Sequence, residues 1–173
     1  LSSAASDVYK RQNLPIVFFN RIAPEVSAYN VIIDDYKWAF TAVEHLIKEG
    51  YKRIAHLAGP ENLFLSKERK RGYIDALKKY GYPIEEELII PAGILMESGI
   101  TAAYSILEMP NKPDAIFAVN DPAAIGAMKT LQKKGMVIPD DIAFVGFSES
   151  QKALIIEPNL TSVEQPTFEM GKV

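Results

Sequence analysis

The sequence predicts an α/β fold in which helices cover both faces of parallel sheets, the doubly wound arrangement. Short apolar runs alternate along the chain with longer segments whose apolar residues recur at helical spacing. Glycines follow several of these longer segments, and the connecting loops are short. Strands that alternate with helices pair in parallel, because each helix carries the chain back to the start of the next strand.

The clearest unit lies in the second half of the chain. Ala115–Val119 is an apolar run between polar turn residues, which predicts a buried strand. Asp121 is a suitable N-cap for the next helix, Pro122 suits its first position, and Gly135 suits its end. Ile142–Gly146 is a second apolar run. These segments predict one strand–helix–strand unit with a right-handed crossover.

The same patterns predict further elements along the rest of the chain. Strands are expected at residues 16–20, 31–33, 53–58, 88–90 and 160–165, and helices at 36–49, 66–80 and 98–108, with a last helix starting at Pro166. The repeated order of strand and helix supports the predicted fold class.

Polar side chains follow both strands of the clearest unit. Asn120 follows the first strand, and Ser148 and Glu149 follow the second. Ligands of open parallel sheets bind beyond the carboxyl ends of the strands, so we expect an amide, a hydroxyl and a carboxylate at one edge. These groups suit a neutral ligand rich in hydroxyls. The alternative is that Asn120 and Asp121 only cap the helix.

Arg69 is a candidate for a charged contact with that ligand. It lies in the first turn of the helix predicted from Ser66, where a cation opposes the helix dipole, so a role other than helix stability is indicated. Its guanidinium offers five N–H donors in a fixed plane, which suit vicinal hydroxyls or a carboxylate. The alternative is a surface salt bridge with Glu68 or with an acid of the preceding loop.

The composition narrows the class of protein. The 173 residues carry a net charge of −3, which offers no basic surface for nucleic acid. No apolar stretch approaches the roughly 20 residues that a membrane helix needs, so we expect no membrane partner. The absence of cysteine excludes disulfides and thiolate metal sites and suits a reducing compartment.

The sequence contains no recognisable catalytic or metal-binding pattern. The two histidines, His45 and His56, lie in a predicted helix and a predicted strand, without the spacing of a metal pair or of a base beside a nucleophile. Neither common glycine-rich phosphate loop occurs. We therefore predict no catalytic residue, no metal and no cofactor, and an enzyme acting on sugars or nucleotides is disfavoured.

Residues 1–12 do not follow the pattern of the rest of the chain. Ser2–Gln12 (SSAASDVYKRQ) resembles the translation of a sequencing adaptor, so residues 1–12 are interpreted as non-native and excluded from fold reasoning. At the other end, Met170–Val173 falls within a helical pattern. We expect on this basis that the sequence is a piece of a longer protein.

Six motifs occur in a characteristic order and spacing: PIVFFNR (15–21), AVEHLIKEGYKRIAHLAGP (42–60), RKRGYIDAL (69–77), PDAIFAVNDPAAIGAM (113–128), IPDDIAFVGF (138–147) and LTSVEQP (160–166). From about residue 14 to residue 173, the chain resembles the effector-binding core of LacI-type bacterial transcription regulators. The resemblance implies a periplasmic-binding-protein-like core of two lobes, each a parallel sheet flanked by helices, with a small effector between them.

The resemblance also implies a division of the chain. Residues 13–49 and 164–173 would belong to the first lobe, which is incomplete, and residues 50–163 to the second lobe. The N-terminal DNA-binding head and the first half of lobe one would be missing. DNA would therefore be bound only through that missing head.

Three residues match effector-binding positions of the family: Arg69 its arginine, Asn120 the asparagine of its Asn-Asp motif, and Gln165 a polar position at the second crossing between lobes. Ser148 stands where many members carry an aspartate that accepts from sugar hydroxyls. Glu149 beside it is a possible substitute for that carboxylate.

Aromatic contacts with the ligand depart from the family pattern. Ile94 stands where many members carry an aromatic that stacks on the effector, and Trp38 stands at a position usually held by glycine. Phe19 or Phe64 is the candidate for an apolar platform in place of that aromatic.

The expected function is effector binding, with a sugar as ligand, in a cytoplasmic homodimeric transcription regulator. Ligand binding would shift the lobes and so control binding to DNA. The alternative from another class is a periplasmic sugar-binding protein of a transport system, which shares the two-lobe fold and predicts the same pocket.

Overall fold

The computed structural model describes residues 16–20, 22, 28–148 and 150–172. The chain divides into two compact units, Leu1–Ile33 with Pro166–Val173, and Asp34–Gln165, and each is considered by itself. Residues 1–12, predicted to be non-native, and the candidate ligand residue Glu149 lie outside the described residues.

A five-stranded parallel sheet forms the centre of the unit Asp34–Gln165. The strand order is β4-β3-β5-β6-β7, and all neighbours run parallel. The strands are β3 (Ile54–Ala58), β4 (Ile89–Pro91), β5 (Ala115–Ala118), β6 (Ala143–Ser148) and β7 (Thr161–Glu164). The predicted parallel pairing across the strand–helix–strand unit is confirmed, with Ala115 beside Ala143.

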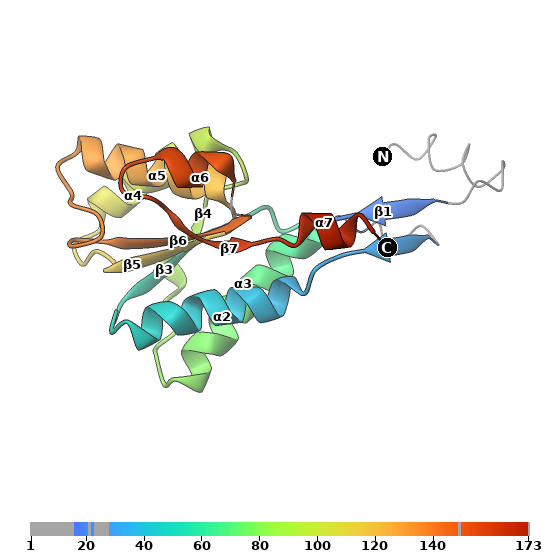
Figure 1. Ribbon diagram of the computed structural model, residues 1–173. Helices are drawn as coiled ribbons and strands as arrows, with labels where there is room; N and C mark the ends of the chain where they lie inside the picture. Colours follow the sequence, from blue (N-terminus) through green and yellow to red (C-terminus); the bar gives the residue numbers. More distant parts are fainter. Residues whose placement is uncertain (1–15, 21, 23–27, 149, 173) are drawn as a thin grey trace. The chain divides into compact units, whose positions relative to one another are not determined.

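Helices cover both faces of this sheet (Figure 1). On one face lie α2 (Asp35–Lys48) and α3 (Phe64–Lys79); on the other lie α4 (Met96–Glu108), α5 (Asp121–Lys133) and α6 (Gln151–Ile155). A short 3₁₀ helix, η1 (Glu86–Leu88), precedes β4. The doubly wound α/β arrangement predicted from the sequence is therefore confirmed.

The core beneath α4, α5 and α6 depends on a close approach of two helices. Its buried side chains include Leu57, Ile116 and Leu131. Gly99 of α4 lies against the carbonyl of Ala123, and Gly126 of α5 lies against the backbone of α4, so closely that a Cβ on either glycine would collide. These two glycines let the helix backbones pack against each other, which seals the apolar core.

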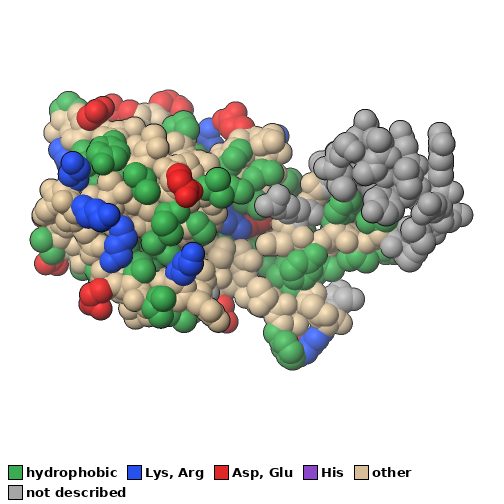
Figure 2. Space-filling view, turned by 90° about the horizontal axis from the view of Figure 1, so that it is seen from above, with side chains coloured by type: hydrophobic (Ala, Val, Ile, Leu, Met, Phe, Trp, Pro, Cys, Tyr) green, Lys and Arg blue, Asp and Glu red, His purple; other side chains and the backbone are tan. Residues whose placement is uncertain are grey.

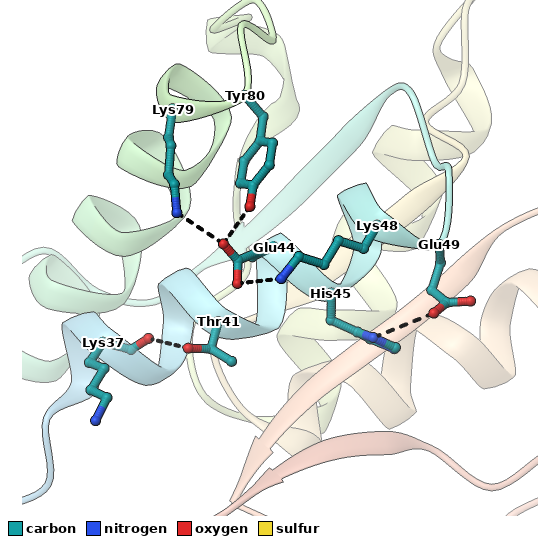
Figure 3. Close-up of polar contacts among 8 residues, drawn as sticks. All are labelled: Lys37, Thr41, Glu44, His45, Lys48, Glu49, Lys79 and Tyr80. Atoms are coloured by element: carbon teal, nitrogen blue, oxygen red, sulfur yellow. Dashed lines mark hydrogen bonds and ion pairs between the residues drawn. The ribbon is translucent and has the colours of Figure 1, made fainter.

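The opposite face is held by α2 packed on α3. Glu44 of α2 accepts a hydrogen bond from Lys79, the last residue of α3, at 3.2 Å and another from Tyr80, the residue after it (Figure 3). It also pairs with Lys48 of its own helix at 2.9 Å. These contacts, the hydrogen bond from Tyr80 foremost, lower the pKa of Glu44 to about 2. Gly72 of α3 is again close-packed, against the backbone of α2.

Helix α2 packs within the compact unit that begins at Asp34. The apolar stripe of α2, including Ala39, Val43 and Leu46, is buried in this unit. The predicted lobe boundaries, with residues 13–49 and 164–173 in the first lobe and residues 50–163 in the second, stay a prediction.

Several element boundaries also differ from the predictions. Helix α3 begins at Phe64, so Ser66 is not its N-cap and Arg69 lies in the second turn instead of the first. Helix α5 is capped by Asn120 and not by Asp121. Helix α6 was not predicted, because five residues are too few to show helical periodicity.

The other unit contributes three short elements to the described residues. Strand β1 (Val17–Phe19) pairs in parallel with β2 (Tyr29–Val31), which begins two residues before the predicted strand at 31–33. Helix α7 (Thr167–Met170) lies where a helix was predicted after Pro166.

The surface carries apolar side chains among charged ones on the face formed by α4, α5 and α6 (Figure 2). The large exposed ones on α4 and α6 are Ile100, Tyr104, Leu154 and Ile155. Among the helices of the described ranges, none has the length and apolar character needed to cross a bilayer.

His56 of β3 gives the fold a pH dependence. It is fully buried, its Nδ1 donates to the carbonyl of Phe117 at 3.0 Å, and its Nε2 has no partner. Burial lowers the pKa of the imidazole to about 4, from an ordinary value of 6.5. The unfolded chain therefore takes up a proton between these two pH values, where the folded chain does not.

We predict that the free energy of unfolding falls as the pH is lowered from 6.5 to 4, and that His56 accounts for up to about 3 kcal/mol of this fall. Urea unfolding at a series of pH values measures it. His56→Phe, which keeps a flat ring between Tyr73 and Phe117, should show a shallower slope in that window. An unchanged slope in this variant would rule out His56 as its source.

Candidate functional site

The carboxyl ends of the five parallel strands meet at one edge of the sheet. Asn120 follows β5, Ser148 ends β6, and Gln165 follows β7. This edge is where open α/β sheets bind ligands. The arrangement brings the residues predicted from the strand–helix–strand unit to a common edge.

Arg69 lies beneath this edge as a buried residue. Its Nε and Nη2 donate to Oδ1 of Asp35 at 2.8 and 2.6 Å, and its Nη1 donates to the carbonyl of Val119. The guanidinium carbon lies 3.5 Å from the centre of the Phe147 ring, a cation–π contact. The expected surface salt bridge with Glu68 is absent, and Glu68 pairs with Arg71 instead.

These contacts connect Arg69 with the other candidate residues. Val119 directly precedes Asn120, and Phe147 directly precedes Ser148. Arg69 therefore fixes the ends of β5 and β6 at the points where the two polar side chains emerge. Arg69, Asn120 and Ser148 come together at one edge of the sheet.

Asn120 uses both ends of its side-chain amide. Its Oδ1 accepts from the backbone N–H of Ala123 at 3.0 Å, which caps α5, and its Nδ2 donates to the carbonyl of Ile94 at 2.9 Å. Asn120 is thus a helix cap, as the alternative interpretation held, but capping is not its only contact. The second bond ties the loop before α4 to the sheet edge, so Asn120 also shapes the candidate site.

Asp121 has a different task from the one predicted. Its carboxylate is fully buried, and accepts from the hydroxyl of Ser162 and from the backbone N–H of Ser150, both at 2.6 Å. A Cβ on Gly146 would collide with this carboxylate, so glycine is needed there. Asp121 thereby holds the backbone at Ser150, two residues after the end of β6 at Ser148.

Ser148 adopts a backbone conformation that is rare for a residue with a side chain. Its φ is +126°, in a region that favours glycine. Its Oγ accepts a hydrogen bond from Nε2 of Gln165 at 3.2 Å, which links the ends of β6 and β7. Backbone strain of this kind is concentrated at binding sites.

The two aromatic candidates for an apolar platform, Phe64 and Phe19, lie in different elements. Phe64 is the first residue of α3 and is 40% exposed. Phe19 lies in β1, in the other compact unit, and is 50% exposed. The carbonyl of Ile94, at the position where the resemblance implies an aromatic, accepts a hydrogen bond from Asn120.

Sequence reasoning missed Asp35, the partner of Arg69. Adjacent acids before a helix suit a turn or an N-cap, and this holds for Asp34, which accepts from the N–H of Lys37 at 2.9 Å. Asp35 is instead buried. No local signal in the sequence indicates this, because an acid in the first turn of a helix is also explained by the helix dipole.

Within the described ranges, no group of three or more His, Cys, Asp or Glu side chains has the geometry to hold a metal ion. A groove of about 640 Å³ lies between α3 and strand β4 and reaches the ends of β3 and β4 at Ala58 and Pro91. None of the predicted ligand residues that the structure describes lines it.

Comparisons with known proteins agree with this geometry. A family model described as a periplasmic binding protein-like domain matches residues 43–173. The HTH-type transcriptional repressor CytR of Escherichia coli is 33% identical over 168 residues, which are 96% of this chain and 49% of that protein. The probable HTH-type transcriptional repressor ExuR of Bacillus subtilis is 36% identical over 157 residues, 91% of this chain and 47% of that protein.

Solved structures show the same fold. The structure described as a complex of the transcriptional regulator CelR with cellobiose has a TM-score of 0.90 at 32% identity, and covers 99% of this chain and 53% of that chain. A regulatory protein of the LacI family from Chloroflexus aggregans has a TM-score of 0.88 at 33% identity, covering 99% and 62%. The chain spans about half the length of the relatives CytR and ExuR.

The parallel sheet and the helices on both of its faces define a domain of the doubly wound α/β class. The chain belongs to the family of periplasmic binding protein-like domains, and corresponds to the effector-binding core of LacI-type transcription regulators.

Backbone strain at Ser148 gives a stability prediction. Ser148→Gly and Ser148→Ala both lose the hydrogen bond with Gln165, but only glycine relieves the positive φ. We expect Ser148→Gly to be more stable than Ser148→Ala by about 1 kcal/mol, measured by urea unfolding. Equal stabilities would contradict strain at this position.

Proposed function

We propose that this chain binds a small saccharide effector in a LacI-type transcription regulator. The observation that carries the proposal is that one buried arginine, Arg69, contacts the residues directly before Asn120 and Ser148. This supports a common binding surface made from the guanidinium, the Asn120 amide, the Ser148 hydroxyl and Gln165. Such groups exchange hydrogen bonds with sugar hydroxyls.

The relatives support the class of protein. CytR and ExuR are transcriptional repressors by name, and CelR is a transcriptional regulator solved with cellobiose. We infer that this chain serves a regulator, with DNA bound by a head outside this sequence, homodimeric assembly, and a place in the cytoplasm. These named relatives favour the regulator over the alternative of a periplasmic sugar-binding protein for transport, and over an enzyme.

The mechanism we propose is a shift between two conformations. A ligand changes such an equilibrium only by binding one conformation more tightly than the other, with coupling free energies of about 1–3 kcal/mol in known cases. The groups that would sense the ligand are those at the carboxyl edge, because they connect the ends of β5, β6 and β7.

Calorimetric titration with a set of saccharides, including cellobiose, glucose, galactose and ribose, tests the proposal. For the saccharide that binds, we expect Arg69→Met and Asn120→Ser each to weaken binding about tenfold or more, since a hydrogen bond to a charged group contributes about 1.5–3 kcal/mol. Serine at position 120 keeps an N-cap for α5, so the change isolates the amide.

Lys67→Ala is the matched control, because Lys67 is an exposed residue of the same helix as Arg69. It should leave the affinity unchanged. Unaltered affinity in both Arg69→Met and Asn120→Ser would refute the binding surface. If no member of the saccharide set binds, the proposed function is refuted.

A further inference from the structure

Asp35 and Arg69 form the ion pair of the candidate site, and both are removed from solvent. Their side chains are 6% and 3% exposed, and both Nε and Nη2 of Arg69 donate to the single oxygen Oδ1. Capping of α2 does not need this carboxylate, because Asp34 already accepts from the N–H of Lys37. Asp35 is therefore free to orient Arg69.

The contacts of Arg69 use three of its N–H donors and cover one face of its guanidinium. Of its five N–H donors, three point at protein acceptors: two at Asp35 and one at the Val119 carbonyl. The Phe147 ring covers one face. The remaining two donors, one on each terminal nitrogen, are held in a fixed direction and are the ones a ligand can use.

Burying the ion pair between the two helices costs desolvation free energy that apolar side chains would not. Desolvation raises the pKa of Asp35, although Arg69 opposes this, and desolvation lowers the pKa of Arg69. Buried ion pairs are frequently matched or exceeded in stability by apolar residues of similar volume. A role in orienting Arg69 explains why charges are present at a place where apolar packing would suffice.

We propose that Asp35 is a positioning residue for ligand binding: it holds the guanidinium of Arg69 so that its two remaining donors meet the ligand. The inference rests on the proposed function, because Arg69 must be a ligand contact for its orientation to matter. Fixing a flexible side chain beforehand strengthens binding, since less conformational freedom is lost when the ligand arrives.

The first experiment needs no ligand. In the ¹⁵N-labelled 173-residue chain, one arginine Nε–H resonance should exchange slowly with solvent and disappear in Arg69→Lys. Asp35→Asn, which has nearly the same shape, should make this proton exchange much faster. Asp34→Asn, the same change at the neighbouring residue, should leave it unaltered. Slow exchange retained in Asp35→Asn would overturn the proposal.

The second experiment measures affinity for the saccharide that binds the unmodified chain most tightly. We expect Asp35→Asn to raise the dissociation constant about tenfold, while Asp34→Asn leaves it unchanged. In the Arg69→Met background, Asp35→Asn should weaken binding no further. An Asp35→Asn variant that is less stable but binds with unaltered affinity would show a purely structural role and overturn the proposal.

The two experiments separate the two hypotheses. If no saccharide binds the unmodified chain, the proposed function fails, and the exchange of the Arg69 Nε–H still decides whether Asp35 orients the guanidinium. Suppose that a saccharide binds, and that Arg69→Met and Asn120→Ser weaken its binding while Asp35→Asn does not. The positioning role then fails and the proposed function stands.

Discussion

The buried pair of Asp35 and Arg69 is the interaction on which the candidate site depends. It joins the first residue of α2 to the second turn of α3, and through the Val119 carbonyl and the Phe147 ring it reaches the ends of β5 and β6. Without these contacts, four elements would meet at the carboxyl edge with no common anchor. Asn120 and Ser148 each directly follow a residue that Arg69 contacts.

The rest of the edge is built on the same principle of buried polar groups with protein partners. Asp121 binds Ser162 and the Ser150 N–H, Asn120 binds the Ala123 N–H and the Ile94 carbonyl, and these bonds satisfy groups that would otherwise be costly to bury. A buried polar network whose groups are all hydrogen-bonded makes the surrounding loops more rigid. A ligand at this edge would meet a surface that is already ordered.

The fold could be predicted from the sequence because its signals are local. Apolar runs such as Ala115–Val119 need no partner to be recognised, and glycines such as Gly135 end their helix wherever the helix packs. Asn120 and Ser148 could be found for the same reason, since topology alone places strand ends together. Whether they bind a ligand stays a prediction.

The remainder could not be predicted because it depends on contacts between distant residues. Asp35 lies 34 residues before Arg69, and nothing local distinguishes it from Asp34, its exposed neighbour. The place of α2 in the unit that begins at Asp34 depends on its packing against α3, which the sequence leaves open. The positive φ of Ser148 is likewise not signalled by the sequence, because serine is not a residue that favours this region.

A crystal structure of the chain with the bound saccharide would test the central claim most directly. We expect ligand oxygens within about 3.2 Å of a terminal nitrogen of Arg69 and of the Asn120 or Ser148 side chain, with the bond from Arg69 to Asp35 intact. A saccharide seated elsewhere, such as in the groove between α3 and β4, with Arg69 untouched, would contradict the account.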